Sequence, residues 1–196
     1  MVYPQKRIAY FQADEYLALE EKAQTKHEYL RGVIYAWQGY GPLAMAGGTL
    51  RHNRVTLNIA VGLRALLKGS GCDVFMADVR LNSADKSAYF YPDVIVTCSP
   101  ADKARDDGVA EPSLVVEVLS DSTEEFDRGD KFDAYKSFAS LQSYVLVSPE
   151  RRTIEVYSRD DAWSAQARQQ SPDPGTAVDL RCLRLRLSAA EVFDGL

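Results

Sequence analysis

Cysteine and histidine are scarce in this sequence. The 196 residues include three cysteines and two histidines, and the cysteines are far apart, with no CxxC pair. Dispersed cysteines in odd number predict neither a disulfide framework nor a structural zinc site. Cys72, Cys98 and Cys182 are therefore expected to be small core residues.

Long apolar runs are also missing. No stretch reaches the length of about 20 residues that spans a membrane, and the first residues lack the apolar stretch and cleavage site of a secretory signal. The sequence thus predicts a cytoplasmic protein with no membrane partner. The glycine-rich segment 39–48 is expected to be a loop. It has no GxxxxGK[ST] pattern, so a phosphate-binding P-loop is not indicated.

Positive charge is in the minority. Lys and Arg number 23 against 28 Asp and Glu, which gives a net charge of −5. This balance counts weakly against nucleic acid as a partner, because a local basic surface or a bound cation would still change the field near a site. Hydrophobic residues make up 46%, enough for a substantial core in one domain.

Periodicity predicts helices and strands in mixed order, typical of an α/β or α+β domain around one mixed sheet. Capping-box spacing at Ser122 and Glu125, and again at Ser188 and Glu191, supports two of the helix starts. Asp14 is a candidate cap for the first helix, and Gly129 weakens the third. Helices are expected over 13–26, 49–71, 121–141 and 188–193. Strands are expected over 72–82, 88–98, 113–120 and 180–188, with a hairpin in 27–39 and a strand–turn–strand in 143–158.

Two acids interrupt the apolar strands. Glu117 stands in "PSLVVEVLSD", where an unpaired carboxylate would be costly, and Asp93 stands in "YPDVIVTC" after Pro92. Alternation of side chains puts each acid on one face of its strand. If the strands are neighbours, a hard cation such as Mg²⁺ or Mn²⁺ between the two carboxylates would relieve their repulsion. The alternatives are a buried Arg or Lys beside Glu117, and a turn-capping role for Asp93.

The segments "YPDVIV", "LVVEVLS" and "DRGDKFDAY" resemble the PD-(D/E)XK nuclease superfamily. Within it they are most similar to the Uma-two family, whose members are described as restriction endonucleases. The resemblance extends over about 11–163. It implies a restriction-endonuclease-like core, a mixed central β-sheet flanked by helices. We therefore expect a single domain over 1–196, with its core in about 11–163 and a C-terminal strand and helix extension in 164–196.

Carried onto this chain, the resemblance implies that Asp93 and Glu117 are metal ligands for Mg²⁺ or Mn²⁺. The superfamily lysine two residues after the acid is absent, because that position is Leu119. Lys131 on the following helix is expected to replace it and to act on the attacking water. The alternative for Lys131 is a surface pair with Asp127.

Other residues are weaker candidates. Glu28 matches a family acid and is expected to be a third metal ligand or a group behind the ligands, with a solvent-facing strand residue as the alternative. His52, Arg128 and Tyr135 are candidate substrate contacts. For His52 the alternative is a partly buried hydrogen-bonding role, and for Arg128 a solvated helix face.

The resemblance predicts a Mg²⁺-dependent DNA endonuclease that hydrolyses phosphodiesters. A homodimer is expected, because cutting two strands needs two active sites. Two other hypotheses remain. One is a non-catalytic binding or regulatory module that keeps the nuclease fold, favoured by the acidic balance and Leu119. The other is a metal-dependent hydrolase of a substrate other than DNA.

Overall fold

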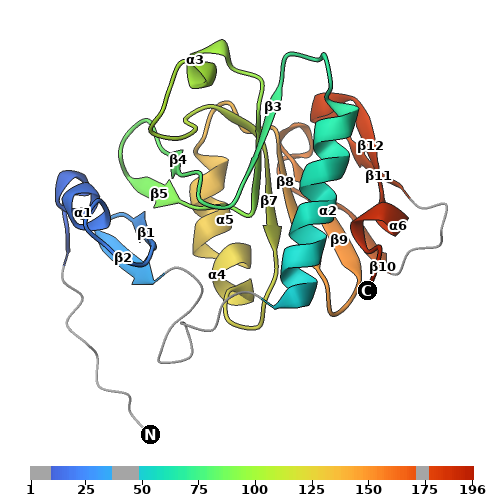
Figure 1. Ribbon diagram of the computed structural model, residues 1–196, viewed down its shortest axis with the longest axis horizontal. Helices are drawn as coiled ribbons and strands as arrows, with labels where there is room; N and C mark the ends of the chain where they lie inside the picture. The colour runs from blue at the N-terminus through green and yellow to red at the C-terminus, as the bar shows by residue number, and fades with distance from the viewer. Residues whose placement is uncertain (1–9, 37–48, 171–176) are drawn as a thin grey trace, which may run out of the picture.

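The fold centres on a six-stranded mixed sheet (Figure 1). The computed structural model describes residues 10–36, 49–170 and 177–196, so the expected loop 39–48 lies outside the described residues. The strand order is β10-β9-β8-β7-β6-β3, with β7 and β8 parallel and the other neighbours antiparallel. The strands are β3 (Asp73–Met76), β6 (Val94–Thr97), β7 (Pro112–Val118), β8 (Ser143–Ser148), β9 (Thr153–Ser158) and β10 (Ala165–Gln170).

The long helix α2 (Leu50–Leu66) covers one face of this sheet. Its residues Val55, Ile59 and Leu63 are fully buried, as their spacing predicts, and the Thr49 hydroxyl caps its first turn. Leu66, which continues the same spacing three residues after Leu63, is 44% exposed. The C-terminal hairpin β11 (Ala177–Leu180) and β12 (Leu185–Ser188) and helix α6 (Ala189–Val192) pack on the same face. The Ser188 side chain caps α6, as expected.

The opposite face carries two short helices and a second sheet. Helices α4 (Glu124–Arg128) and α5 (Asp130–Lys136) form the crossover between the parallel strands. The small sheet has the order β2-β1-β5-β4 and packs beside them. Its strands are β1 (His27–Leu30), β2 (Val33–Ala36), β4 (Leu81–Asn82) and β5 (Ala88–Phe90). Helix α1 (Ala13–Glu20) covers it through Tyr16.

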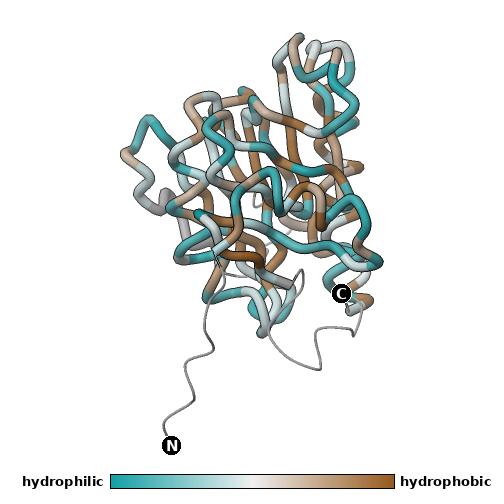
Figure 2. The backbone as a smooth tube through the Cα atoms, turned by 90° about the vertical axis from the view of Figure 1, so that its left-hand side faces the viewer, coloured by the Kyte–Doolittle hydropathy of each residue, from teal (hydrophilic) through white to brown (hydrophobic). Residues whose placement is uncertain are grey.

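Alternating side chains explain why both faces are apolar. In β8, Val145 and Val147 belong to the core under α2, whereas Tyr144 and Leu146 belong to the core under α5. A strand covered on both sides reads as a continuous apolar run. Figure 2 shows the same distribution, with hydrophobic segments inside and hydrophilic segments in the peripheral turns.

Two expected strands are each divided. The segment 72–82 forms β3 and β4, separated by Ala77 and Asp78 with positive φ. The segment 88–98 forms β5 and β6, which belong to different sheets. Pro92 lies at this second break, where it cannot donate a ladder hydrogen bond. One mixed sheet was therefore too simple a prediction: the mixed central sheet is confirmed, and a second sheet sits beside it.

The helical expectations need smaller corrections. Gly129 breaks the segment 121–141 into α4 and α5, and α4 starts after Thr123 rather than at Ser122. The cap of α1 is Gln12, which forms a capping box with Glu15, so Asp14 is not the cap. The polar segment 99–111 contains a short helix, α3 (Pro100–Lys103), and two 3₁₀ turns lie at Arg159–Asp161 and Arg181–Leu183.

The cysteines also differ from expectation. Cys72 and Cys98 form a disulfide that joins the beginning of β3 to the end of β6. Cys72 directly precedes Asp73 and Cys98 directly follows its partner Thr97, so the antiparallel register brings the two cysteines opposite each other. Cys182 is free. Disulfides persist in oxidising compartments, so this bond bears against the cytoplasmic default, which stays a prediction.

The C-terminal segment is shared between the sheet and the α2 face. β10 pairs with β9 and extends the central sheet, while β11, β12 and α6 form the layer next to α2. Within the described ranges, no helix is both long and apolar enough to cross a membrane.

Candidate active site

Asp93 and Glu117 lie side by side at one end of the central sheet. The β6–β7 register pairs Val94 with Val116, which places Asp93, just before β6, opposite Glu117. The Asp93 amide donates to Glu117 Oε2 at 3.3 Å, and the Val118 amide donates to Asp93 Oδ2 at 2.7 Å. Each acid is thus fixed by the backbone of the neighbouring segment, on the sheet face that α4 and α5 cover.

Lys131 reaches the same point from α5. Its Nζ lies 2.8 Å from Glu28 Oε1, 2.9 Å from Glu117 Oε1 and 3.5 Å from Asp127 Oδ1. Only 6% of the Lys131 side chain is exposed. The alternative of a surface pair with Asp127 is therefore wrong, because both partners are buried.

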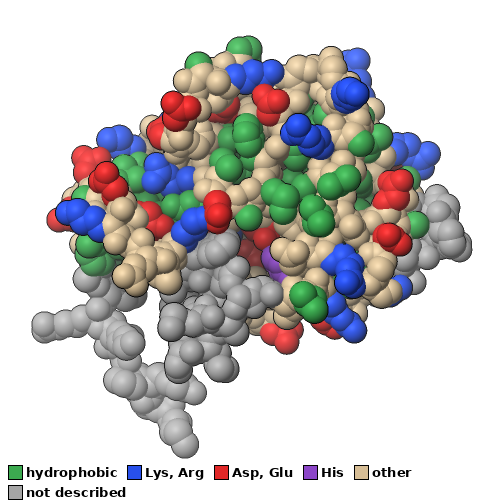
Figure 3. Space-filling model, in the orientation of Figure 1, with side chains coloured by type: hydrophobic (Ala, Val, Ile, Leu, Met, Phe, Trp, Pro, Cys, Tyr) green, Lys and Arg blue, Asp and Glu red, His purple; other side chains and the backbone are tan. Residues whose placement is uncertain are grey.

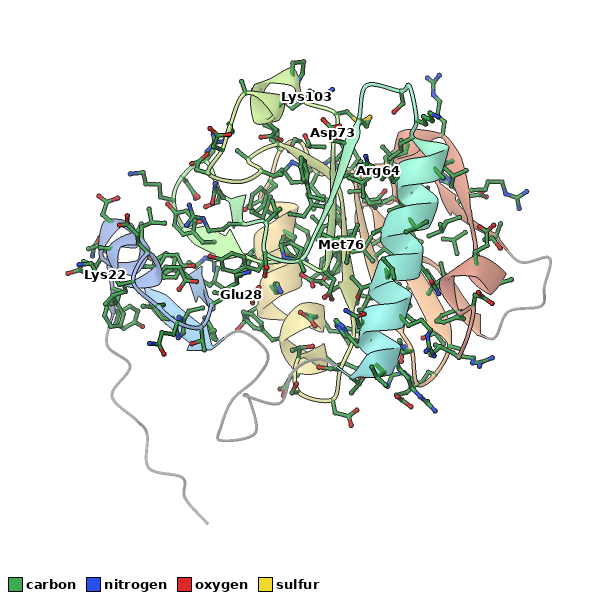
Figure 4. All side chains as sticks on the ribbon, in the orientation of Figure 1. Lys22, Glu28, Arg64, Asp73, Met76 and Lys103 are labelled. Atoms are coloured by element: carbon green, nitrogen blue, oxygen red, sulfur yellow. A yellow bond between two sulfur atoms is a disulfide. The ribbon has the colours of Figure 1, made fainter. Side chains whose placement is uncertain are left out.

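Glu28 is brought in by the small sheet. It stands on β1, extends toward α5 (Figure 4), and its Oε1 accepts a hydrogen bond from the Tyr91 amide at 3.0 Å. Its buried position excludes the solvent-facing alternative. Its contact with Lys131 shows Glu28 as the partner of the lysine in this arrangement.

Tyr135 supports Glu117 from one turn further along α5. Its hydroxyl donates to Glu117 Oε1 at 2.7 Å, and the residue is fully buried. A direct contact between Tyr135 and a substrate is therefore excluded by burial in this arrangement. Leu119, where the superfamily lysine is usual, is buried in the apolar core on this face. Lys131 is the cation that occupies the position near Glu117.

His52 approaches Asp93 from the first turn of α2. Its Nε2 lies 3.3 Å from Asp93 Oδ2, and a fifth of its side chain is exposed. Burial lowers the pKa of His52, but the hydrogen bond and the charge of Asp93 outweigh burial, and the pKa is raised overall. His52 thus contacts the same Asp93 oxygen, Oδ2, that accepts the Val118 amide.

Acids outnumber cations in this cluster. Burial raises the pKa of Glu117 well above its usual range although Lys131 opposes the shift, and burial raises the pKa of Asp127 to about 6. Burial would lower the pKa of Lys131, but Glu117, Glu28 and Asp127 together raise it well above normal. Lys131 is thus a cation among four carboxyl groups, counting Asp93, and the raised pKa values show that this excess of acids is relieved in part by proton binding.

The carboxylates are not grouped as a ready-made metal cage. Over the described part of the chain, no three His, Cys, Asp or Glu side chains form a cluster arranged to hold a metal ion. The reason is visible in the contacts, since the Lys131 ammonium takes one oxygen of Glu28 and one of Glu117. By contrast, Asp93 Oδ1 has no hydrogen-bond partner from the described residues.

Arg128 points elsewhere. Its guanidinium donates to both oxygens of Glu155, at 2.9 and 2.8 Å, and to Glu124 at 2.7 Å. These contacts tie α4 to β9. Because the guanidinium is engaged by these acids, the geometry does not support the predicted contact of Arg128 with a substrate, which stays a prediction.

The sequence profile of the Uma2 family, described as "Putative restriction endonuclease", matches residues 13–190. The chain belongs to this family. Two relatives of this Uma2 protein from Synechocystis sp. (strain ATCC 27184 / PCC 6803 / Kazusa) are similar along most of their length. The protein slr1290 is 38% identical over 93% of this chain and 91% of its own, and sll1609 is 35% identical over 77% and 83%.

A solved structure shares the fold. The crystal structure of a "putative nuclease belonging to DUF820" from Anabaena variabilis superposes with a TM-score of 0.67 at 18% identity, covering 93% of this Uma2 chain and 97% of the other. The expected restriction-endonuclease-like architecture of a mixed sheet flanked by helices is thereby confirmed.

Two features of the cluster were not anticipated from sequence. Asp127 was considered only as part of an exposed pair, yet it is buried against Lys131, and the signal was its four-residue spacing from that lysine. The contact between His52 and Asp93 had no local signal, because it joins α2 and β6 across 41 residues of sequence.

Proposed function

We propose that this Uma2 protein is a divalent-cation-dependent endonuclease that hydrolyses phosphodiester bonds in DNA. The observation that carries the proposal is the convergence of Asp93, Glu117 and Lys131 at one end of the sheet. The descriptions of the family and of the Anabaena protein as nucleases support the same activity.

Asp93 and Glu117 would hold Mg²⁺ or Mn²⁺. Carboxylate oxygens suit these hard cations, and the excess of acids in the cluster fits an added cation. Such a cation polarises the phosphoryl oxygen and acidifies bound water. For Glu28, the role of an acid that holds Lys131 is better supported than that of a third metal ligand, because its Oε1 is 2.8 Å from Lys131 Nζ.

The chain's own groups then have distinct tasks. Lys131, kept protonated by its carboxylate partners, stabilises the negative charge that builds up at phosphorus and orients the attacking water. Tyr135 fixes the orientation of Glu117 through its 2.7 Å hydrogen bond. His52 fixes Asp93.

One observation favours a second candidate, a non-catalytic binding module. Lys131 already forms ion pairs with two of the acids, and no metal cage exists among the described residues. If the ammonium permanently takes the place of the cation, the cluster serves only to hold α5 and the small sheet on the central sheet.

A cleavage assay separates the two. Purified protein is incubated with supercoiled and single-stranded DNA in Mg²⁺, Mn²⁺ or EDTA. We expect slow metal-dependent cutting that Glu117→Ala abolishes and Lys131→Ala reduces mainly through kcat. Metal binding, measured by calorimetry, should fall with Glu117→Ala and persist with Lys131→Ala.

Matched controls lie on the same elements. Lys136→Ala removes a half-buried cation of α5 that pairs with Asp133, and Glu125→Ala removes an exposed acid of α4. Both variants should cut DNA as wild type does. Circular dichroism melts establish that each variant is folded. Wild-type protein that cuts neither DNA with either metal would establish the binding module instead, and full activity of Lys131→Ala would refute the role given to that lysine.

A further inference from the structure

The outer face of α2 combines aliphatic and basic side chains. Leu50, Leu57 and Val61 are 83%, 47% and 58% exposed, and they are three of the six large hydrophobic side chains exposed among the described residues. Arg64 and Lys68 are also exposed, and their side chains form no hydrogen bond or ion pair with any described residue. Figure 3 shows green and blue side chains together along the position of α2.

Their spacing is that of a helix-packing seam. Leu50, Arg54, Leu57, Val61 and Arg64 succeed one another at intervals of four, three, four and three residues. This is the a/d spacing of heptads, in which one helix packs along another. The seam lies opposite the inward stripe through Val55, Ile59 and Leu63, so packing of α2 on its own sheet does not use it.

The sequence around α2 contains no acidic residues. No Asp or Glu occurs between Glu28 and Asp73, in a protein with 28 such residues and a net charge of −5. Arg51, in the first turn, lies at the end of the helix dipole that disfavours cations, and it pairs with Glu150 at 3.0 Å. Arg54 donates to the Gly195 carbonyl. The side chains of Arg64 and Lys68, toward the other end of the helix, are therefore the cations that a partner can use.

We propose that the outer face of α2 is a docking surface for an acidic amphipathic helix of another protein. Carboxylates on such a helix would pair with Arg64 and Lys68, and its aliphatic side chains would cover Leu57 and Val61. The charge complementarity is specific, because the seam offers cations and apolar groups but no acid.

Two other occupants fit less well. A second copy of α2 would bring Arg54 and Arg64 of both chains together without a carboxylate, so like charges would repel. A DNA backbone would satisfy the cations, but phosphates offer no apolar surface to cover Leu57 and Val61 at the centre of the seam. An acidic helix satisfies both halves of the pattern.

Binding of defined probes tests the proposal. The full chain is titrated in EDTA against a fluorescein-labelled synthetic helix that interleaves leucine and glutamate along one face. Three further probes are a scrambled peptide of the same composition, the same helix with lysine in place of glutamate, and a DNA duplex. We expect saturable anisotropy changes with the acidic amphipathic helix and at least about tenfold weaker binding of the other peptides.

Variants locate the site. Leu57→Gln combined with Val61→Gln, and separately Arg64→Glu, should each weaken binding of the acidic helix about tenfold, or about 1.4 kcal/mol. Leu19→Gln, an equally exposed leucine on α1, should leave it unchanged. All three variants change only exposed positions outside the carboxylate cluster. Melting curves and DNA cleavage serve as checks that the fold and the other site are intact.

Four results would overturn the proposal. The first is absence of binding to the acidic helix, and the second is equal binding of the scrambled peptide. The third is binding of the duplex that Arg64→Glu weakens while the Leu57 and Val61 change does not, which would assign the face to DNA. The fourth is a wild-type dimer in sedimentation that the Leu57 and Val61 change dissociates, which would assign it to a second copy.

Discussion

A lysine ammonium that contacts three carboxylates can neutralise only one of them. Lys131 is in this position, with Glu28, Glu117 and Asp127 around it. Buried charges without a partner are costly, and the cluster responds by raising the affinity of its acids for protons. The residues of this cluster therefore compete for protons and, under the proposed function, for a metal cation.

Asp127 should make the stability of the protein depend on pH. Burial raises its pKa from 3.8 to about 6. An acid of raised pKa contributes stability that is fully present below about pH 4 and is lost as pH rises through about 6. Asp127→Asn should therefore gain stability relative to wild type over this interval, by about 3 kcal/mol for a shift of about two units.

Urea denaturation in EDTA at several pH values between 4 and 8 measures this difference. Asp133→Asn changes an exposed acid of α5 and should show no such gain. If the difference in free energy of unfolding between wild type and Asp127→Asn is constant across this pH range, Asp127 has no raised pKa in the folded protein.

Residue positions in the cluster were predictable to different degrees. Asp93 and Glu117 follow from alternation in two apolar strands, and their adjacency follows once β6 and β7 are paired. Lys131 came from the family resemblance, since Leu119 fills the usual position. The contacts of Glu28 and His52 depend on how the small sheet and α2 dock, and no local pattern encodes that docking.

At the level of elements, the sequence does not reveal a strand boundary where β-forming residues continue across a break. "AYFYPDVIVTC" alternates well enough to read as one strand, yet β5 and β6 pair in different sheets on either side of Pro92. The disulfide was hidden for a related reason. Cys72 and Cys98 meet only because Asp73 pairs with Thr97, and that register is a tertiary property.

The disulfide should stabilise the edge of the central sheet. It closes a loop of 26 residues, for which the chain-entropy account gives about 3.5 kcal/mol. Cys72→Ser with Cys98→Ser should lower the free energy of unfolding by about that amount in urea denaturation without reductant. Cys182→Ser leaves the bond intact. If wild type and the double variant are equally stable without reductant, the bond contributes nothing to the fold.

Gly108 should be intolerant of a side chain. Its φ is +126°, and an added Cβ would overlap the Arg80 carbonyl oxygen where the chain lies against β4. We expect Gly108→Ala to cost about 3 kcal/mol, the upper range for a strained backbone position. Gly69 also has positive φ, at +80°, but open space around it, so Gly69→Ala should cost only about 1 kcal/mol. Thermal melts of the two variants would contradict this account if their losses were equal.

For the whole molecule, the proposed metal site predicts ligand-linked stability. A ligand that binds only the folded state adds about 2.7 kcal/mol at roughly a hundred times its Kd. Millimolar Mg²⁺ or Mn²⁺ should therefore raise the Tm of wild type, and Asp93→Asn should lose the response because an amide is a poorer ligand than a carboxylate. Differential scanning fluorimetry measures both, with Asp133→Asn as the control. Equal shifts in wild type and Asp93→Asn would place the metal elsewhere.

The split of the cluster between two sheets has a dynamic consequence. Glu28 is carried by β1 of the small sheet, whereas Asp93 and Glu117 belong to the central sheet, and Lys131 pairs with acids from both. A sub-global opening that lifts the small sheet would take Glu28 away and leave the lysine to Glu117 and Asp127. Amide hydrogen exchange in β1 would then report on the same fluctuation that sets the charge beside Asp93. Opening of the small sheet would thus change the charge around Asp93 and Glu117 without any residue of that sheet contacting a substrate.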